Sequence, residues 1–328
     1  METEKSSERQ GILLMLASIV FFAVNVLMLR GIALRAPMAD GYVSSVYRGW
    51  IGLLTVWIAF RGRGFEPRHL ITRPVLLLRG GVGAAGILLF YLTIEHLGAG
   101  RATIINLTYP IFGAVMAAAW LKERLVPRQM VWMLAALGGL MVFLADGALE
   151  ARLSRHELLA ALGAVVAGLA VVLIRVLGRT EHTSTIYASQ CVWTIVVAWP
   201  ACMDRVFEIP VAAAAGLVIA ALMVTAGQLA LTHAFRHLSV AKGSALQMLL
   251  PLVIGVGGFV LFNERFTGME LVGAAFTLFA TWRVMQARMR TDGVQSASAM
   301  AVERAPAPSP AARPGTLVAE PRTPTVSG

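Results

Sequence analysis

Charged residues are scarce in this chain of 328 residues, since Asp, Glu, Lys and Arg make up only 14% of it. Soluble domains carry about 25% charged residues, and a soluble core of this length would need more charge to cover its surface. The apolar share is 57% and the mean hydropathy is +0.72. The scarcity of charge argues against a soluble enzyme and indicates that lipid surrounds most of the chain.

Cysteines and catalytic motifs are scarce as well. The two cysteines, Cys191 and Cys202, lie in one apolar run and are too few for the disulfide framework of a secreted protein. The sequence shows no metal-ligand spacing, nucleotide-binding fingerprint or nucleophile motif. We therefore expect no enzymatic activity, no cofactor and no metal site.

Long runs without charge are abundant instead. A helix needs about 20 residues to cross about 30 Å of hydrocarbon at 1.5 Å per residue. Three of the runs are short, but each continues past a single charge (Arg48, Arg79 or Glu270) into more apolar sequence. The sequence thus predicts an all-α membrane protein with ten transmembrane helices, at 10–29, 49–60, 80–94, 102–121, 129–145, 158–174, 182–203, 209–235, 243–263 and 271–282.

The two ends of the chain differ from these runs. Residues 1–10 form a short N-terminal tail, and residues 288–328 form a Pro/Ala-rich tail in which six of the fourteen prolines fall. Such a tail cannot bury enough apolar surface to fold, so we expect it to be disordered. The composition is compatible with a bacterial inner membrane.

Basic residues are unevenly distributed between the two sets of connecting segments. If the N-terminus is inside, 17 Lys and Arg lie on inner segments and 8 on outer ones. Inner segments of membrane proteins are enriched in these residues, so we expect both termini in the cytoplasm. The bases lie singly or in small groups between apolar runs, which indicates membrane orientation and not nucleic-acid binding.

The chain matches itself at a shift of 141 residues without a gap. His96-Leu97 corresponds to His237-Leu238, Pro110 to Pro251, and Glu123-Arg124 to Glu264-Arg265; Asn106 and Gln247 each precede a proline by four positions. This is the most specific signal in the sequence. The shift carries five helices, an odd number, so the second copy must be inverted in the membrane. Residues 11–146 and 147–287 are the two expected five-helix repeats, an arrangement typical of alternating-access carriers.

The first copy also contains several short sequence motifs that resemble those of a known family. They are Phe90-Tyr91, His96-Leu97, Gly100-Arg101-Ala102, Tyr109-Pro110, Trp120-Leu121-Lys122-Glu123-Arg124 and Gly138-Gly139. These residues resemble the EamA-type domain of the drug/metabolite transporter superfamily, and Ala234 through Gly273 is a looser second match. The resemblance covers nearly all of 11–287. It implies a ten-helix carrier with a central cavity between its halves and more peripheral fifth and tenth helices.

The resemblance also indicates what is transported. Families of this kind move amino acids, nucleotide derivatives and other small metabolites, often outward. Small multidrug members place a glutamate in the first helix to exchange protons for cationic drugs, whereas this chain has Asn25 there. None of its 18 acids lies near a helix centre, which argues against a multidrug antiporter.

The strongest candidates for a substrate site are Asn25, Arg48, Asn106, Tyr109 and Gln247. Pro110 and Pro251 withdraw a hydrogen bond from the carbonyls of Asn106 and Gln247, which favours helix kinks beside a cavity; a structural kink with helix–helix hydrogen bonds is the alternative. Arg48 either faces an anion in the cavity or extends to the lipid headgroups.

Weaker candidates are Tyr91, Gln190, Gln228 and His233, whose polar groups are explained at least as well by helix–helix hydrogen bonds. Glu123-Arg124 and Glu264-Arg265 end their helices at opposite faces; they are either gates or interfacial anchors, and anchors are the simpler interpretation.

The sequence therefore predicts a secondary transporter that exports an amino acid or a related polar or amphipathic metabolite by alternating access. A membrane-embedded enzyme would need a cluster of catalytic groups, and a receptor or scaffold would not explain the inverted repeat. The expected partners are a small-molecule substrate and the lipid bilayer, and the sequence leaves a homodimer open.

The inverted repeat generates a direct test. Cysteines introduced singly at positions 100 and 241, in a chain lacking Cys191 and Cys202, should react with a membrane-impermeant reagent from opposite faces of the membrane. Labelling of both positions from the same face would contradict the inversion of the second copy.

Overall fold

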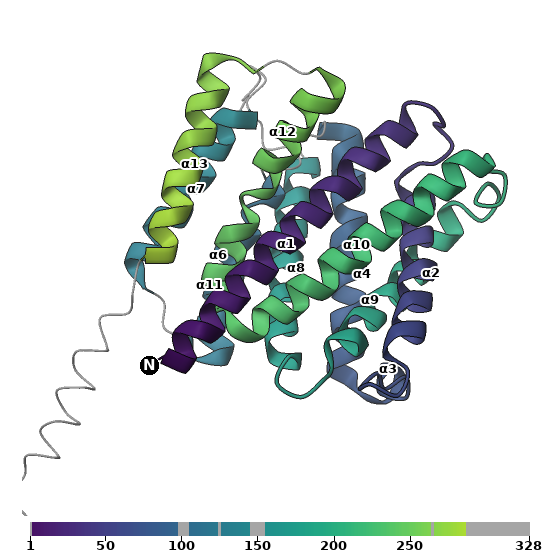
Figure 1. The fold of residues 1–328 in the computed structure, drawn as a ribbon, viewed down its shortest axis with the longest axis horizontal. Coiled ribbons are helices and arrows are strands. Elements are labelled where there is room, and N and C mark those ends of the chain that lie inside the picture. Colours follow the sequence, from purple (N-terminus) through teal and green to yellow (C-terminus); the bar gives the residue numbers. More distant parts are fainter. Residues whose placement is uncertain (1, 98–104, 124–125, 145–154, 264–265, 287–328) are drawn as a thin grey trace, which may run out of the picture. The chain divides into compact units, whose positions relative to one another are not determined.

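The computed structural model describes residues 2–97, 105–123, 126–144, 155–263 and 266–286, and these form a helical bundle (Figure 1). Within these residues, each of the ten predicted runs falls largely on helix, and the ninth is divided between two helices. The helices are α1 (Glu2–Ala33), α2 (Gly41–Phe60), α3 (His69–Thr72), α4 (Pro74–Leu97), α6 (Tyr109–Leu121), α7 (Pro127–Leu144), α8 (Arg155–Leu177), α9 (Thr183–Ala198), the 3-10 turn η1 (Trp199–Ala201), α10 (Val211–His237), α11 (Val240–Gln247), α12 (Leu250–Phe262) and α13 (Gly268–Gln286).

The first helix begins earlier than the sequence predicted. From Glu2 on, the segment expected as a separate tail is the first part of α1. It is held against the bundle by a hydrogen bond of 2.8 Å between Ser7 Oγ and His237 Nδ1 and by an ion pair between Glu8 and Lys242. These contacts explain the difference, because Glu8, one of the charges that marked the segment as a tail, is paired with another helix. The expected tail 288–328 lies outside the described residues.

Not every helix meets the length and apolarity of a free-standing membrane span. Within the described residues, five helical stretches do: Ser6–Ala33, Gly41–Phe60, Arg155–Leu177, Val211–His237 and Val240–Phe262. Pro74–Phe90, Tyr109–Leu121 and Pro127–Phe143 are apolar but shorter. The 16-residue α9 is more polar, and every residue from Thr183 to Cys191 in it is buried. This part of its surface meets other helices instead of lipid, and Tyr187, Ser189 and Gln190 form hydrogen bonds within the protein.

The two repeats share their backbone details as well as their sequence marks. Both proline-containing helices are broken before the proline, where Thr108 and Leu249, 141 positions apart, precede α6 and α12 with nearly identical backbone angles. Both helices end on a left-handed residue, Lys122 (φ 55°) and Asn263 (φ 56°), whose N–H donates back to Ala117 or Gly258. The sequence repeat is therefore a repeat of local structure.

Helix packing follows the same symmetry. The shift pairs α1 with α8, α2 with α9, α4 with α10, α6 with α12, and α7 with α13. The main contacts then come in equivalent sets: α1–α10 with α4–α8, α2–α10 with α4–α9, and α1–α12 with α6–α8. The contacts α2–α9 and α7–α13 join equivalent helices of the two copies.

The last of these contacts depends on two glycines. Helices α7 and α13 lie side by side (Figure 1), and the hydroxyl of Thr277 donates to the carbonyl of Ala136, its own repeat equivalent, at 3.3 Å. A Cβ on Gly273 would lie 2.6 Å from the carbonyl oxygen of Gly139 and from the amide nitrogen of Phe143. Small residues allow such close approach between membrane helices.

Gly273→Ala should therefore push α13 away from α7 and lower the stability of the protein by about 1–3 kcal/mol, the usual cost of overpacking. Gly138→Ala is the matched control, because nothing lies within 4 Å of a Cβ at Gly138 in α7. Thermal unfolding in detergent measures both variants. Equal melting temperatures would contradict the close contact.

Candidate functional site

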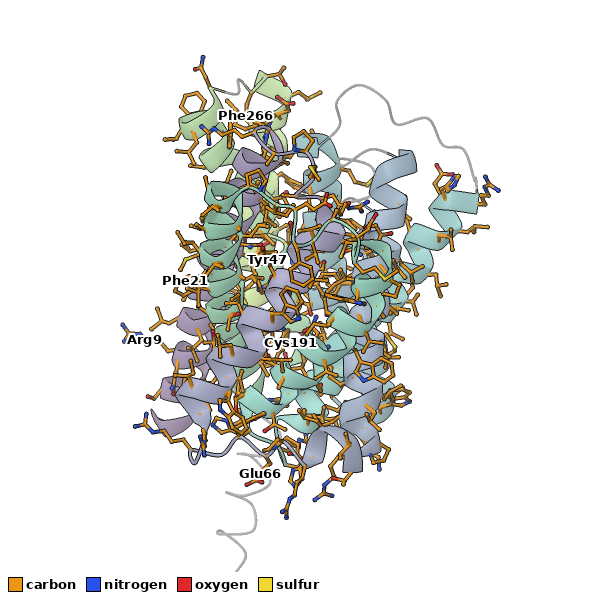
Figure 2. All side chains as sticks on the ribbon, turned by 90° about the vertical axis from the view of Figure 1, so that its right-hand side faces the viewer. Arg9, Phe21, Tyr47, Glu66, Cys191 and Phe266 are labelled. Carbon is orange, nitrogen blue, oxygen red and sulfur yellow. The ribbon has the colours of Figure 1, made fainter. Side chains whose placement is uncertain are left out.

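The bundle has two ends at which many of its helices begin or finish. The end where α1 begins is here named the N-terminal end. Figure 2 shows Arg9 and Glu66 toward this end, Phe266 toward the opposite, far end, and Cys191 between them. This frame separates the polar groups of the protein into a central cluster and two groups at the ends.

The central cluster consists of two arginines and two glutamines. Arg48 of α2 donates to Gln228 of α10 at 3.3 Å, and Arg79 of α4 donates to Gln190 of α9 at 3.0 Å. Arg79 is 2% exposed, and both glutamines are 6% exposed. Arg48 is half-buried, and the two guanidinium groups lie close enough to repel each other. Both arginines come from the first repeat and both glutamines from the second.

Asn25 joins this cluster from α1. Its side-chain amide donates to the carbonyl of Ala220 in α10 at 2.8 Å. Asn25 and Arg48 line a cavity of about 30 Å³ together with Leu29, Ser44, Ser45, Leu217, Ala220, Ala221 and Val224. A water needs roughly 10–15 Å³ of such space, so the cavity is large enough for water but too small for a metabolite in this conformation.

Glycines make room for the Arg79 side chain. A Cβ on Gly83, one turn further along α4, would collide with Nη1 of Arg79. A Cβ on Gly80 would lie 2.6 Å from the carbonyl oxygen of Ser189 and would also overlap Trp193, so α4 and α9 touch at this level. The two glycines thus let the guanidinium group fold back along its own helix toward Gln190.

The cluster is backed by further uncharged polar groups. The hydroxyls of Tyr187 and Thr225 lie 3.0 Å apart, and a Cβ on Gly52 would lie 2.7 Å from both Tyr187 Oη and Cys191 Sγ. Helices α2, α9 and α10 therefore meet tightly behind Arg48.

The other residues predicted for the site lie elsewhere in the described structure. Gln247 ends α11, is 5% exposed, and donates to Met15 Sδ at 2.9 Å and to Ser18 Oγ at 3.5 Å, which is a helix–helix contact. Tyr109 packs against the apolar cluster that contains Leu140 and Phe143. The ring of His233 packs against that of His237 in a tilted arrangement, with centroids 5.3 Å apart.

For two further residues predicted for the site, Asn106 and Tyr91, what the structure describes is their position along the chain. Asn106 is half-buried, just before the break that precedes Pro110. Tyr91 lies in α4, and its side chain is outside the described part of the chain. The structure thus gathers Asn25, Arg48, Gln190 and Gln228 from the predicted set into one cluster, while Gln247, Tyr109 and His233 have other neighbours.

Arg79 was not among the residues predicted for the site, although the expected third helix continues past it. It counted as a base of an inner connecting segment, but α4 begins at Pro74, so Arg79 is its sixth residue and lies about 7.5 Å along the helix axis. A signal was present, because the run 80–94 is too short to cross a membrane unless the helix includes Arg79.

Glu123 connects several helices at the N-terminal end. Its carboxylate pairs with Arg175 at 3.2 Å and accepts from the amide of Val240 at 3.2 Å. Arg175 also donates to the carbonyls of Phe235 and Arg236, each at 2.7 Å. Residues of α8, α10 and α11 are therefore tied to the end of α6, and Glu123 is more than an interfacial anchor. Its neighbour Arg124 and the equivalents Glu264 and Arg265 lie outside the described residues.

A second group at the same end centres on Glu181. Its carboxylate lies 2.8 Å from His69 Nδ1 and 3.8 Å from Arg73, and its carbonyl accepts from Arg236. The adjacent His182 accepts from the amide of Ser184 and caps α9. Burial and the charge of Arg236 lower the pKa of His182, which favours the neutral ring that this cap requires.

At the far end, the described residues show one ion pair together with packed aromatic rings. Arg205 pairs with Asp40 at 2.6 Å, and Asp40 caps α2. The rings of Trp50, Trp199 and Phe207 pack against one another beside this pair, with centroids 5.6 to 6.1 Å apart. Ionic contacts therefore lie at both ends of the bundle, with the central cluster between them.

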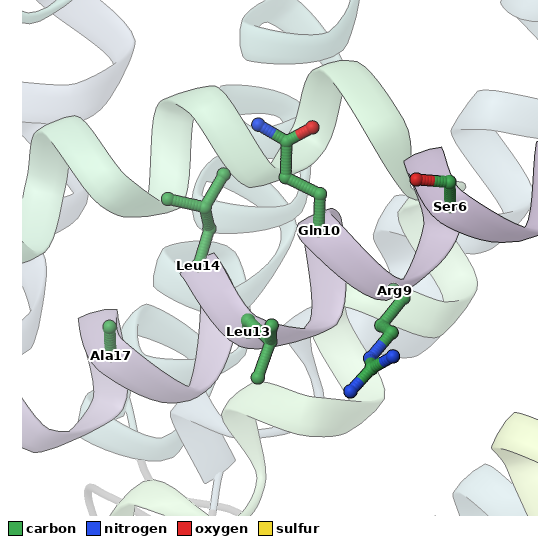
Figure 3. A pocket seen from close by; sticks show the side chains of 6 residues that line it. All are labelled: Ser6, Arg9, Gln10, Leu13, Leu14 and Ala17. Carbon is green, nitrogen blue, oxygen red and sulfur yellow. The ribbon is translucent and has the colours of Figure 1, made fainter. Parts of the chain in front are cut away.

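A larger hollow of about 430 Å³ lies on the surface of α1, away from the cluster (Figure 3). Ser6, Arg9, Gln10, Leu13, Leu14 and Ala17 line it, and all of them come from this one helix. Leu13 is 58% exposed there. An apolar helix surface that begins at an arginine is typical of the membrane boundary, so we do not assign the substrate to this hollow.

Comparison with known proteins accords with this architecture. The chain is 30% identical to the pseudopaline exporter CntI of Pseudomonas aeruginosa over 278 residues, which cover 83% of this chain and 94% of the relative. It is 29% identical over 209 residues to a protein of Streptantibioticus cattleyicolor named "Probable terminal-alkyne amino-acid exporter", covering 62% of this chain and 69% of that protein.

One solved crystal structure shares the fold with a TM-score of 0.68 and 16% identity, covering 83% of this chain and 95% of that chain. The model of the EamA-like transporter family matches residues 9–145 and 155–286, close to the two repeats expected from the sequence. The chain belongs to the EamA-like transporter family, and the expected all-helical membrane transporter built from two repeats is confirmed.

Proposed function

We propose that this transporter exports an amino-acid-like metabolite by alternating access, and that Asn25, Arg48, Gln190 and Gln228 contact it. The observation that carries the proposal is the central polar cluster between two ends that are each held by ionic contacts. An inverted repeat can exchange the roles of its two ends around such a centre. Relatives named as exporters of pseudopaline and of a terminal-alkyne amino acid support export and this substrate class.

The proposal includes an orientation. Both termini are placed in the cytoplasm of a bacterial inner membrane, which is supported by the 17 Lys and Arg on the inner segments against 8 on the outer ones. The N-terminal end is then the cytoplasmic end, so an exported metabolite enters between the contacts of Glu123 and leaves past the Asp40–Arg205 pair.

Uptake into inverted membrane vesicles tests transport directly. Vesicles that contain the protein should accumulate at least one compound from a panel of labelled amino acids and their derivatives, and vesicles without the protein should not. Absence of protein-dependent accumulation across a broad panel would contradict the proposal.

Alternating access predicts that weakening the contacts at one end of the bundle favours the conformation in which that end is open. Glu123→Gln removes the charge that pairs with Arg175, which should disfavour the closed N-terminal end by about 1 kcal/mol, or about fivefold. The buried Cys191 is the reporter in a Cys202→Ala background, because it lies in the interior of the bundle (Figure 2). A membrane-impermeant maleimide should label it faster in inverted vesicles of the variant.

Glu66→Gln is the matched control for this labelling experiment. The Glu66 side chain is exposed at the same end, and only its backbone amide bonds another segment, at Thr185. Its labelling rate should equal that of the unchanged protein. If Glu123→Gln and Glu66→Gln gave equal rates, Glu123 would not hold the end closed.

A further inference from the structure

The interior of the bundle carries positive charge without visible compensation. Arg79 makes one hydrogen bond, to Gln190, and its Nε and Nη1 are buried without a partner. Arg48, which is close enough to repel it, donates to the neutral oxygen of Gln228. Among the residues that the structure describes, no carboxylate forms an ion pair with either arginine.

An unpaired guanidinium group in a membrane protein is energetically costly. Removing a charge from water is costly unless an opposite charge and hydrogen bonds replace the water, and charged groups within membrane helices usually mark a substrate or ion path. Four other basic side chains of the described bundle, Arg73, Arg175, Arg205 and Lys242, do have carboxylate partners. The central pair differs from them in having only amide partners.

The position of the pair points to the transported molecule as the missing anion. Arg48 lines the central cavity beside Asn25, Ser44 and Ser45. The two glutamines that hold the guanidinium groups come from α9 and α10 of the second repeat, so relative movement of the repeats would change the contacts of both arginines. An anion bound to both arginines would compete with these glutamines, and so change how the first repeat is held to the second.

We propose that Arg48 and Arg79 together bind a carboxylate of the exported metabolite, which makes the substrate class an organic acid or amino acid with a free carboxylate. This inference rests on the proposed export function. Guanidinium groups bind carboxylates through paired, charge-assisted hydrogen bonds. Gln190 and Gln228 hold the two groups in place while the site is empty.

The test compares the small molecules in spent medium of cells that make the unchanged protein, a variant, or neither. The compounds enriched by the unchanged protein should carry a free carboxylate, and Arg48→Gln and Arg79→Gln should lower their export at least about tenfold at equal membrane levels. Arg48→Lys should fall between, because a lysine retains the charge but not the paired geometry. Arg63→Gln, which removes an exposed charge, should export normally.

A pair of glycine variants tests whether the position of the Arg79 guanidinium group matters when its charge is retained. Gly83→Ala should displace the Arg79 guanidinium group and weaken export, whereas Gly81→Ala, with nothing within 4 Å of its Cβ, should not. A competition experiment with the unchanged protein tests the charge of the substrate. The carboxamide of an exported acid should not compete with the acid for export, because the carboxamide carries no negative charge.

The outcomes distinguish this inference from the proposed function. Export of compounds without a carboxylate, or full export by both arginine-to-glutamine variants, would overturn the inference and leave the export function standing. No enriched compound with the unchanged protein would overturn the export function and the inference with it.

Discussion

Polar groups that lie within a bilayer must find their partners inside the protein, because the hydrocarbon offers none. In this chain the constraint is most severe at Arg48 and Arg79, two guanidinium groups placed within helices of the first repeat. Their hydrogen bonds to Gln228 and Gln190 tie α2 to α10 and α4 to α9. Glycines at 80 and 83 let α4 approach α9 closely enough for the bond of Arg79 to form.

The scaffold is symmetric, but its charges are not. Helix breaks, left-handed caps and helix contacts recur at the 141-residue shift. At the same shift, Arg48 corresponds to Ser189 and Arg79 to Ala220. The duplicated architecture therefore provides two halves that can exchange conformations, while substitution within only one half supplies the positive charge. The helix arrangement around the centre therefore comes from the repeat, whereas the positive charge of the centre comes from residues that are not repeated.

The two ends of the bundle are held differently. At the N-terminal end, Glu123 and Arg175 join the ends of α6, α8, α10 and α11 through an ion pair and backbone hydrogen bonds. At the far end, the one ion pair among the described residues, Asp40 with Arg205, is accompanied by packed aromatic rings. The small volume of the central cavity accords with a conformation in which both ends are held, so passage of a metabolite requires one set of contacts to separate.

The sequence by itself determined the helical membrane architecture, the number of helical runs and the repeat, because apolar length and identical marks at a constant shift are local properties of the chain. It also placed Asn25, Arg48, Gln190 and Gln228 among the candidates, since polar residues in apolar runs stand out. Only the tertiary structure decided which of them meet, that Gln247 pairs with α1, and that Arg79 is buried. The reason is physical: a hydrogen bond between helices depends on their rotation and approach, which arise from packing across more than a hundred residues of chain.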